Sequence, residues 1–196
     1  MMNTPLENVD SYNSTAKFLH WLIAVALVVQ WVVGLTVDYF ARPTKIALIN
    51  FHATFGTIIL LLVLARIVWR LKSGVPSLPK GVPALMRLAS HGTQILFYLL
   101  LIFVPLAGLG LRLSRGDGIN LVMFTLPSPL AANKVLAHDF GQVHALAAYV
   151  LLGLAGLHIL AALYHHFVRA DGILQRMLPS GPMTRLSASP EATPPH

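Results

Sequence analysis

Two histidines lie fourteen residues apart in an otherwise apolar stretch, GQVHALAAYVLLGLAGLHILAALYHHF, which runs from Gly141 to Phe167. Fourteen residues are close to four turns of an α-helix, so His144 and His158 would point to nearly the same side of one helix, about 21 Å apart along its axis. A polar ring left without a partner in an apolar environment costs several kcal/mol. Each imidazole is therefore expected to face a specific partner.

The composition indicates that these histidines belong to a membrane protein. Of the 196 residues, 56% are hydrophobic and 11% are charged, whereas a soluble domain carries about 25% charged residues. The chain has no cysteine, which excludes disulfides, thiolate catalysis, iron–sulfur clusters and Cys-bound zinc. Nine histidines against seven acidic residues make imidazole the metal ligand in excess. The net charge is +7, and the basic residues lie beside apolar segments. This position favours topology signals over nucleic-acid binding.

Four apolar segments are long enough to cross about 30 Å of hydrocarbon, which takes roughly 20 helical residues. They cover approximately residues 16–37, 46–71, 88–113 and 138–168. Asn13, Ser14 and Thr15 are predicted N-cap residues of the first, and Pro105 is predicted to kink the third. We predict an all-α, up-down-up-down four-helix bundle. It occupies residues 15–178, between an N-terminal cytoplasmic segment (1–14) and a disordered tail (179–196).

The basic residues predict the orientation of the bundle. An even number of spans places both termini on one side of the membrane. Nine basic residues lie on that side: Lys17, Arg66, Arg70, Lys72, Lys80, Arg87, Arg169, Arg176 and Arg185. Five lie on the other side: Arg42, Lys45, Arg112, Arg115 and Lys134. The positive-inside rule then places both termini in the cytoplasm.

Depth in the membrane sorts four histidines into two pairs. His52 and His144 lie early in spans that begin on the outer side, and we call them the outer pair. His20 and His158 lie near the cytoplasmic side and form the inner pair. Imidazoles from two facing helices can ligate haem iron axially, and helix bundles hold such cofactors in their cores. We predict one haem on each pair.

Three more residues are predicted to face the bundle. Arg66 follows His52 by fourteen residues, so it either contacts a haem propionate or a quinone-site group or snorkels to the interface as a topology signal. Gly34 and Gly56 lie near the outer level. There, glycine either gives a macrocycle room beside the backbone or lets helices pack closely.

The other five histidines carry weaker expectations. His91 lies in the first turn of the third span, where it would compete with His20 as a ligand or line a quinone pocket. His165 and His166 are expected at the membrane interface, and His138 at the outer start of the fourth span. The last, His196, belongs to the predicted tail.

Four motifs in this order resemble the bacterial cytochrome b561 family: FLHWLIAVALVVQW, NFHATFGTIILLLVLARIVWRLK, LASHGTQILFYLLLIFVPLAGL and VHALAAYVLLGLAGLHILAALYHHF. The resemblance covers about residues 14–179 and is specific as an ordered set. It implies a membrane dihaem cytochrome of the bacterial inner membrane, with two haem b. The inner haem would be held by His20 and His158 and the outer one by His52 and His144, in agreement with the depth argument. The loop GDGINLVMFTLPSPLAANKVLAHDF, which would cover the outer haem, is less typical of the family.

The resemblance also implies a function. Members exchange electrons with ubiquinone, and the best understood oxidise periplasmic superoxide, so we expect an oxidoreductase of the superoxide:quinone type. The alternative is a haem b anchor subunit that passes electrons between a partner dehydrogenase or hydrogenase and the quinone pool. A transporter with metal-binding or proton-relaying histidines is a third reading, which the near absence of intramembrane carboxylates disfavours. The five basic residues of the outer side would attract anionic superoxide or are solvated loop charges.

Overall fold

Four helices make up nearly all of the computed structural model, which describes residues 11–76, 84–121 and 124–179. They are α1 (Ser14–Thr36), α2 (Arg42–Ser73), α3 (Ala84–Ser114) and α4 (Lys134–Tyr164). Each is long and apolar enough to cross a membrane, which confirms the predicted helical class. The predicted tail, from residue 180 onward, and the first ten residues lie outside the described part of the chain.

The helix boundaries follow from local sequence. Asn13 caps α1, because its Oδ1 accepts a hydrogen bond from the Ala16 N–H at 2.9 Å. Asn133 caps α4 in the same way through the Leu136 N–H, at 3.0 Å. Pro43 lies in the first turn of α2, where its missing N–H costs nothing. Helix α3 continues as one helix through Pro105.

The sequence did not predict the short strands between α3 and α4. Strands β1 (Ile119–Leu121) and β2 (Phe124–Leu126) pair in antiparallel fashion, with Ile119 opposite Leu126. This hairpin lies at the same end of the molecule as the turn between α1 and α2, which contains the short helix η1 (Val37–Tyr39). We call this the loop end, and the opposite end, where α1 begins, the terminal end.

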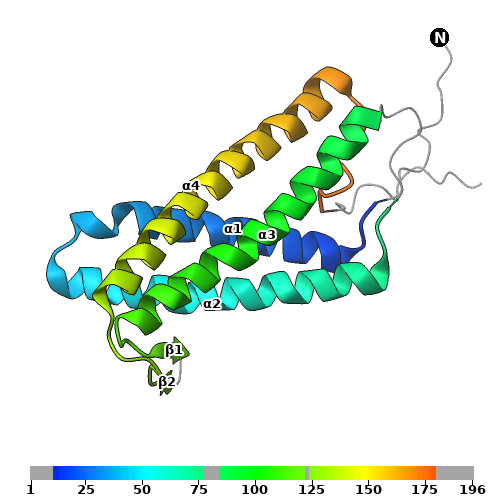
Figure 1. Cartoon of the computed structure of the whole chain (residues 1–196). Helices are drawn as coiled ribbons and strands as arrows, with labels where there is room; N and C mark the ends of the chain where they lie inside the picture. The colour runs from blue at the N-terminus through cyan, green and yellow to red at the C-terminus, as the bar shows by residue number, and fades with distance from the viewer. Residues whose placement is uncertain (1–10, 77–83, 122–123, 180–196) are drawn as a thin grey trace, which may run out of the picture.

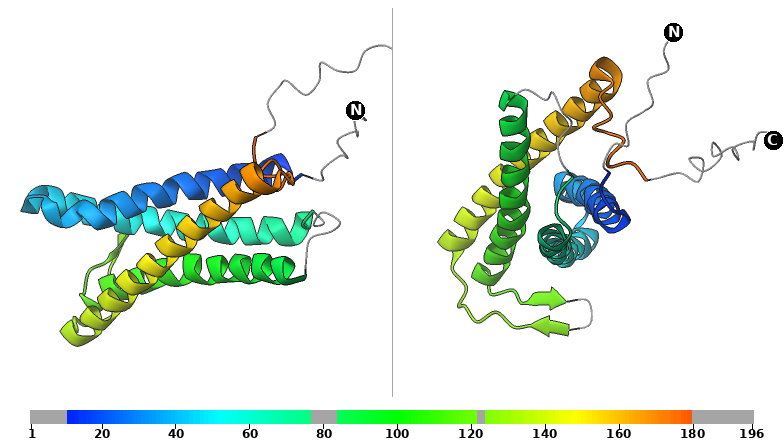
Figure 2. Two further views of the ribbon diagram at one scale, coloured as in Figure 1. Left: turned by 90° about the horizontal axis from the view of Figure 1, so that it is seen from above. Right: turned by 90° about the vertical axis from the view of Figure 1, so that its right-hand side faces the viewer.

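The bundle consists of two helical hairpins that cross at an angle. Figure 1 shows α1 and α2 side by side, with α3 and α4 inclined across them. Figure 2 agrees, because the right-hand view looks along α1 and α2 and shows α3 and α4 from the side. Within the described residues, the extensive helix–helix contacts join α1 to α2, α2 to α3 and α3 to α4. Helix α4 therefore faces α1 and α2 across a space that side chains or a cofactor must fill.

The packed apolar core lies between the two histidine levels. Its buried members are Ile23, Ala26, Ile59, Val63, Leu101 and Leu151. Leu151 is midway between His144 and His158 along α4, so it marks the middle of the bundle. Most other large apolar side chains point outward and are exposed, as expected for helices that face lipid.

The chain after α4 turns back onto the start of α1. A π-helical turn, His165–Arg169, ends at Ala170, whose φ is 48°. Asp171 then accepts hydrogen bonds from His165 Nδ1 at 2.6 Å and Arg169 Nε at 3.2 Å. Partial burial raises the pKa of Asp171, but these bonds outweigh it and hold that pKa below its usual value of 3.8. Further on, the Met177 carbonyl accepts a hydrogen bond from Trp21 Nε1 at 2.9 Å, which joins this segment to α1.

Candidate cofactor sites

The outer pair brings α2 and α4 together near the loop end. The ring centroids of His52 and His144 are 6.0 Å apart, and the ring planes meet at 81°. His144 Nδ1 lies 2.9 Å from the carbonyl oxygen of Val104 on α3. A hydrogen bond there makes Nδ1 the protonated nitrogen and leaves Nε2 available to a metal. His52 Nδ1 is buried, and no other described residue offers it a hydrogen bond.

Glycines of the neighbouring helices border both rings of the outer pair. A methyl group on Gly34 of α1 would lie 3.3 Å from His52 Cε1, and one on Gly108 of α3 would lie 3.1 Å from His144 Nδ1. Gly34 thus borders a histidine ring at the outer level, where the sequence left open whether it gives a macrocycle room or lets helices pack closely. At Gly56 a methyl group would instead meet Gln30 Nε2 at 3.0 Å, so helix packing accounts for that glycine.

Gln30 is a polar member of this region that our sequence reasoning missed. It is 8% exposed, and its Nε2 donates a hydrogen bond to the His52 carbonyl oxygen at 2.9 Å. Its Oε1 is buried and has no hydrogen-bond partner in the described part of the chain. The sequence already contained a signal for this position, because a single glutamine in the middle of an apolar span needs a polar partner inside the bundle.

A mostly apolar cavity adjoins the outer pair. Side chains from all four helices line it, and His52, His144 and Gln30 are among them. Arg112 lines its loop-end side and donates a hydrogen bond to Asn50 Oδ1 at 3.0 Å. Arg112 lies in the last turn of α3 and is held there by this bond, so it is not one of the solvated loop charges that the sequence allowed.

The inner pair joins α1 to α4 toward the terminal end. The ring centroids of His20 and His158 are 6.3 Å apart, and their planes meet at 76°. Aromatic rings flank both histidines: Phe97 of α3 lies 5.4 Å from His158, and Trp21 lies 5.6 Å from His20. Each level therefore has one imidazole from α4 and one from the first helical hairpin.

Arg66 is near the inner pair but is bound to backbone. Its Nη1 donates a hydrogen bond to the carbonyl oxygen of Ala16, one turn before His20, at 2.7 Å. Arg66 also lines a cavity of about 360 Å³ at the terminal end, which we call the terminal cavity. Both predictions for Arg66, a cofactor or quinone contact and a topology signal near the helix end, stay predictions.

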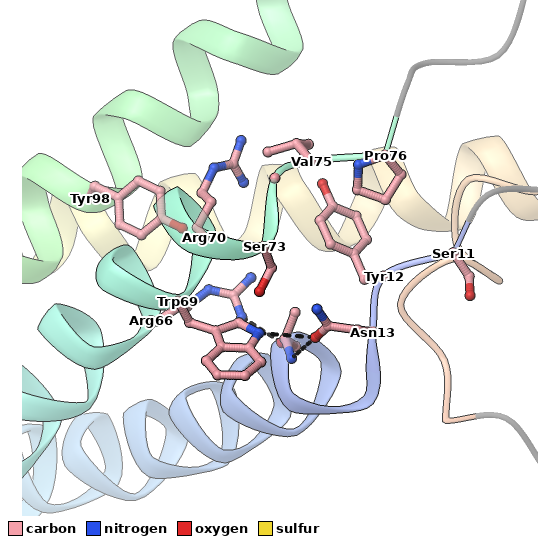
Figure 3. Close-up of a pocket in the computed structure, with 12 residues that line it drawn as sticks. Ser11, Tyr12, Asn13, Arg66, Trp69, Arg70, Ser73, Val75, Pro76 and Tyr98 are labelled. Carbon is pink, nitrogen blue, oxygen red and sulfur yellow. Dashed lines mark hydrogen bonds between the residues drawn. The ribbon is translucent and has the colours of Figure 1, made fainter.

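The terminal cavity combines cationic and aromatic side chains. Figure 3 shows Arg70 and Tyr98 on one side and Tyr12 on the other. Arg70 lies over the Tyr98 ring, 6.0 Å from its centroid, and donates to Gln94 Oε1 at 2.7 Å. Trp69 Nε1 donates to Asn13 Oδ1 at 3.0 Å and fixes the wall next to Arg66. Of these residues, the sequence had proposed only Arg66 as part of a cofactor or quinone site.

The other four histidines that the structure describes lie outside the two pairs. His91 is exposed, and its Nδ1 lies 2.9 Å from the Arg87 carbonyl of its own helix. His165 contacts Asp171, and His166 Nδ1 lies 3.0 Å from Gln175 Nε2, so both participate in the turn after α4. His138 is exposed near the start of α4.

The geometry of the two pairs fits a haem better than a bare metal ion. At a metal–nitrogen bond of about 2 Å, imidazoles on opposite sides of one metal have centroids about 6 Å apart. Both pairs have this spacing. A metal ion held by protein alone usually takes three or four side-chain ligands, and no group of three such residues occurs among the described residues. Two ligands suffice when a macrocycle supplies the other four.

A membrane-spanning four-helix bundle with facing imidazoles at two levels has the architecture of an electron-transfer cytochrome. The sequence comparisons agree: the family model described as prokaryotic cytochrome b561 matches residues 11–180, and this chain belongs to that family. The family binds haem b and transfers electrons.

Three relatives illustrate the family. A probable superoxide oxidase, CybB, of Yersinia pestis is 32% identical over 162 residues, which cover 82% of this chain and 92% of the relative. Cytochrome b561 homolog 2 of Escherichia coli is 28% identical over 180 residues, 90% of this chain and 93% of the relative. A cytochrome b562 of Cereibacter sphaeroides is 31% identical over 166 residues, 82% and 90% of the two chains.

Proposed function

We propose that this chain is a dihaem b cytochrome of the bacterial inner membrane that transfers electrons from periplasmic superoxide to ubiquinone. The observation that carries the proposal is the presence of two imidazole pairs, with centroids 6.0 and 6.3 Å apart, at opposite levels of one bundle. One pair alone would serve a single redox centre. Two pairs at different depths serve to move electrons across part of the membrane.

The four histidines would hold the cofactors and define the reaction type. Haem bound at each pair would supply reversible one-electron chemistry. Both imidazoles of each pair would be occupied in holding the haem, which would leave it no position for binding a substrate. Donor and acceptor would therefore bind at the protein surface and react by outer-sphere electron transfer.

The donor assignment is supported by the name of one relative and by the chemistry of superoxide. One relative is named a probable superoxide oxidase, and superoxide is a small anion that needs no docking protein. Oxidation of two superoxide anions to two molecules of oxygen releases two electrons. These electrons and two protons reduce one ubiquinone to ubiquinol, so the reaction is balanced without another reductant.

The terminal cavity is the acceptor site that we propose. It adjoins Ala16, one turn before His20, and contains arginine and tyrosine donors that suit the carbonyl oxygens of a quinone ring. Tyr98 and Trp69 would border the ring with aromatic surface. A cavity of about 360 Å³ is of the size that binds small molecules.

The proposal is tested on the purified full-length chain in detergent. A dithionite-reduced minus oxidised visible spectrum, with haem quantified per polypeptide, should give two low-spin b haems. Enzymatically generated superoxide should then reduce a short-chain ubiquinone, with one quinol formed per two superoxide consumed. In Tyr98→Phe, haem content should stay at two while the quinone concentration needed for half-maximal rate rises.

Each other outcome has a distinct meaning. Two haems without superoxide-driven quinone reduction would reject the oxidase and favour the haem-bearing anchor that needs a partner redox protein. One haem would show that one histidine pair is wrongly assigned. A colourless protein, after haem reconstitution has been tried, would overturn the electron-transfer proposal and favour a transporter.

A further inference from the structure

Helix α3 contributes no histidine to either pair, yet it contacts the outer pair on two successive turns. The Val104 carbonyl oxygen lies 2.9 Å from His144 Nδ1. Gly108, one turn further along α3, lies directly against the same imidazole. Residues four apart lie on one face of a helix, so the His144 ring covers this face from Val104 to Gly108.

The contact leaves no space for a side chain at Gly108. A methyl group there would lie 3.1 Å from Nδ1 and 3.2 Å from Cε1 of His144. Contacts this short would force the ring to shift by a few tenths of an ångström. The shift would act on the same nitrogen that bonds to Val104, because Nδ1 is the ring atom nearest to the added methyl group.

The two rings of the outer pair differ in their support. His144 has a backbone hydrogen-bond partner, whereas the buried Nδ1 of His52 has none within the described part of the chain. The α3 backbone is therefore the described group that can polarise a ligand of this pair. A carbonyl that accepts a hydrogen bond from the Nδ1–H of a ligating histidine fixes the ring and raises the basicity of Nε2.

We propose that Gly108 is a positioning residue that sets the reduction potential of the outer haem through the hydrogen bond from His144 to Val104. The inference rests on the proposed haem ligation by His52 and His144. A more basic ligand favours the oxidised iron, so the hydrogen bond lowers the potential of the haem that His144 binds. Loss or lengthening of the bond should raise it.

The test is a potentiometric titration of the haems in Gly108→Ala. The outer component is assigned beforehand as the one that disappears in His52→Ala. In Gly108→Ala its midpoint should move to a more positive value and its low-spin EPR signal should shift, while the inner component stays at the wild-type values. Gly92→Ala is the matched control, because it lies in the same helix and an added methyl group would meet nothing within 4 Å.

The possible failures are distinguishable. If Gly108→Ala binds two haems per chain and both midpoints and both EPR signals stay at their wild-type values, the inference is overturned. The proposed function would then remain intact. A wild-type chain without haem would overturn the proposed function itself. Selective loss of the outer haem in Gly108→Ala would support the positioning role.

A second measurement decides the case in which Gly108→Ala does not fold. ENDOR spectra of the wild-type protein transferred to deuterated water report exchange of the Nδ1 proton on each haem ligand. A slowly exchanging, hydrogen-bonded proton on one ligand of the outer haem would support the inference. Rapid exchange on both ligands of that haem would overturn it.

Discussion

At the scale of residues, histidine position decides which imidazoles can serve as ligands. His20, His52, His144 and His158 face another imidazole on a different helix, at 6.0 to 6.3 Å between centroids. His91 is equally close in sequence to an apolar span, but its side chain is exposed and it lies outside both pairs. Residue type alone does not separate these cases, and the position of the facing helix does.

Removal of one ligand from each pair should therefore remove one haem at a time. We expect His20→Ala and His52→Ala each to lower the haem content from about two to about one per chain, because one remaining imidazole holds the macrocycle too weakly. His91→Ala should retain both haems. Pyridine haemochromogen assays on purified variants measure this ratio, and a wild-type ratio in His52→Ala would contradict the assignment of the outer pair.

At the scale of elements, small residues determine how closely α3 and α4 approach. Gly110 of α3 faces Phe140 of α4, and a methyl group on Gly110 would lie 2.7 Å from the ring. Gly108 lies one half-turn away and accommodates His144. Close packing through small residues is typical of membrane helices, where the backbones gain van der Waals contact. The same packing brings His144 within reach of the α3 backbone.

Gly110→Ala should destabilise the bundle although alanine is the better helix former. Overpacking costs about 1–3 kcal/mol, which exceeds the gain of about 1 kcal/mol in helix propensity. In Gly92→Ala the added methyl group would enter open space, so this variant should gain helix propensity without the cost of overpacking. Thermal unfolding of the haem-loaded proteins in detergent should thus give Tm changes of opposite sign. A higher Tm in Gly110→Ala would show that the Phe140 ring moves aside freely.

At the scale of the whole molecule, the basic side chains at the loop end differ in whether they are held by a partner or exposed. Lys45 pairs with Asp38 at 2.6 Å, and Arg112 bonds to Asn50. Arg42, Arg115 and Lys134 are exposed, so they are the better candidates for attracting an anion to the outer pair. Such steering acts over about one Debye length, which is roughly 8–10 Å at physiological salt.

Superoxide oxidation should accordingly slow as ionic strength rises. We expect a decrease of up to about tenfold between low and physiological salt, since charge steering raises association rates by 10-fold or more. Replacement of Arg42, Arg115 and Lys134 by glutamine should lower the low-salt rate and flatten this dependence. Reduction by an uncharged reductant provides the control, and a superoxide rate that is insensitive to salt would exclude steering.

The sequence by itself determined the helical class and the approximate helix ends. Apolar length fixes how many residues can cross a membrane, and the cap residue Asn13 acts within one turn of its own position. The fourteen-residue spacing placed His144 and His158 on one face of α4, and membrane depth predicted their partners. These inferences depend on helix geometry, which is local, and on the environment, which composition reveals.

Only the tertiary structure decided what surrounds each histidine. Three contacts depend on how the helices rotate and cross. They are the bond from His144 to Val104, the contact of Gly34 with His52, and the bond from Gln30 to the His52 carbonyl. The same holds for the terminal cavity, whose walls come from α1, α2, α3 and the segments just before α1 and just after α2. Crossing angles arise from the sum of many side-chain contacts between helices distant in sequence. Helical periodicity predicts which face of a helix points inward, but contains no information about the residue opposite.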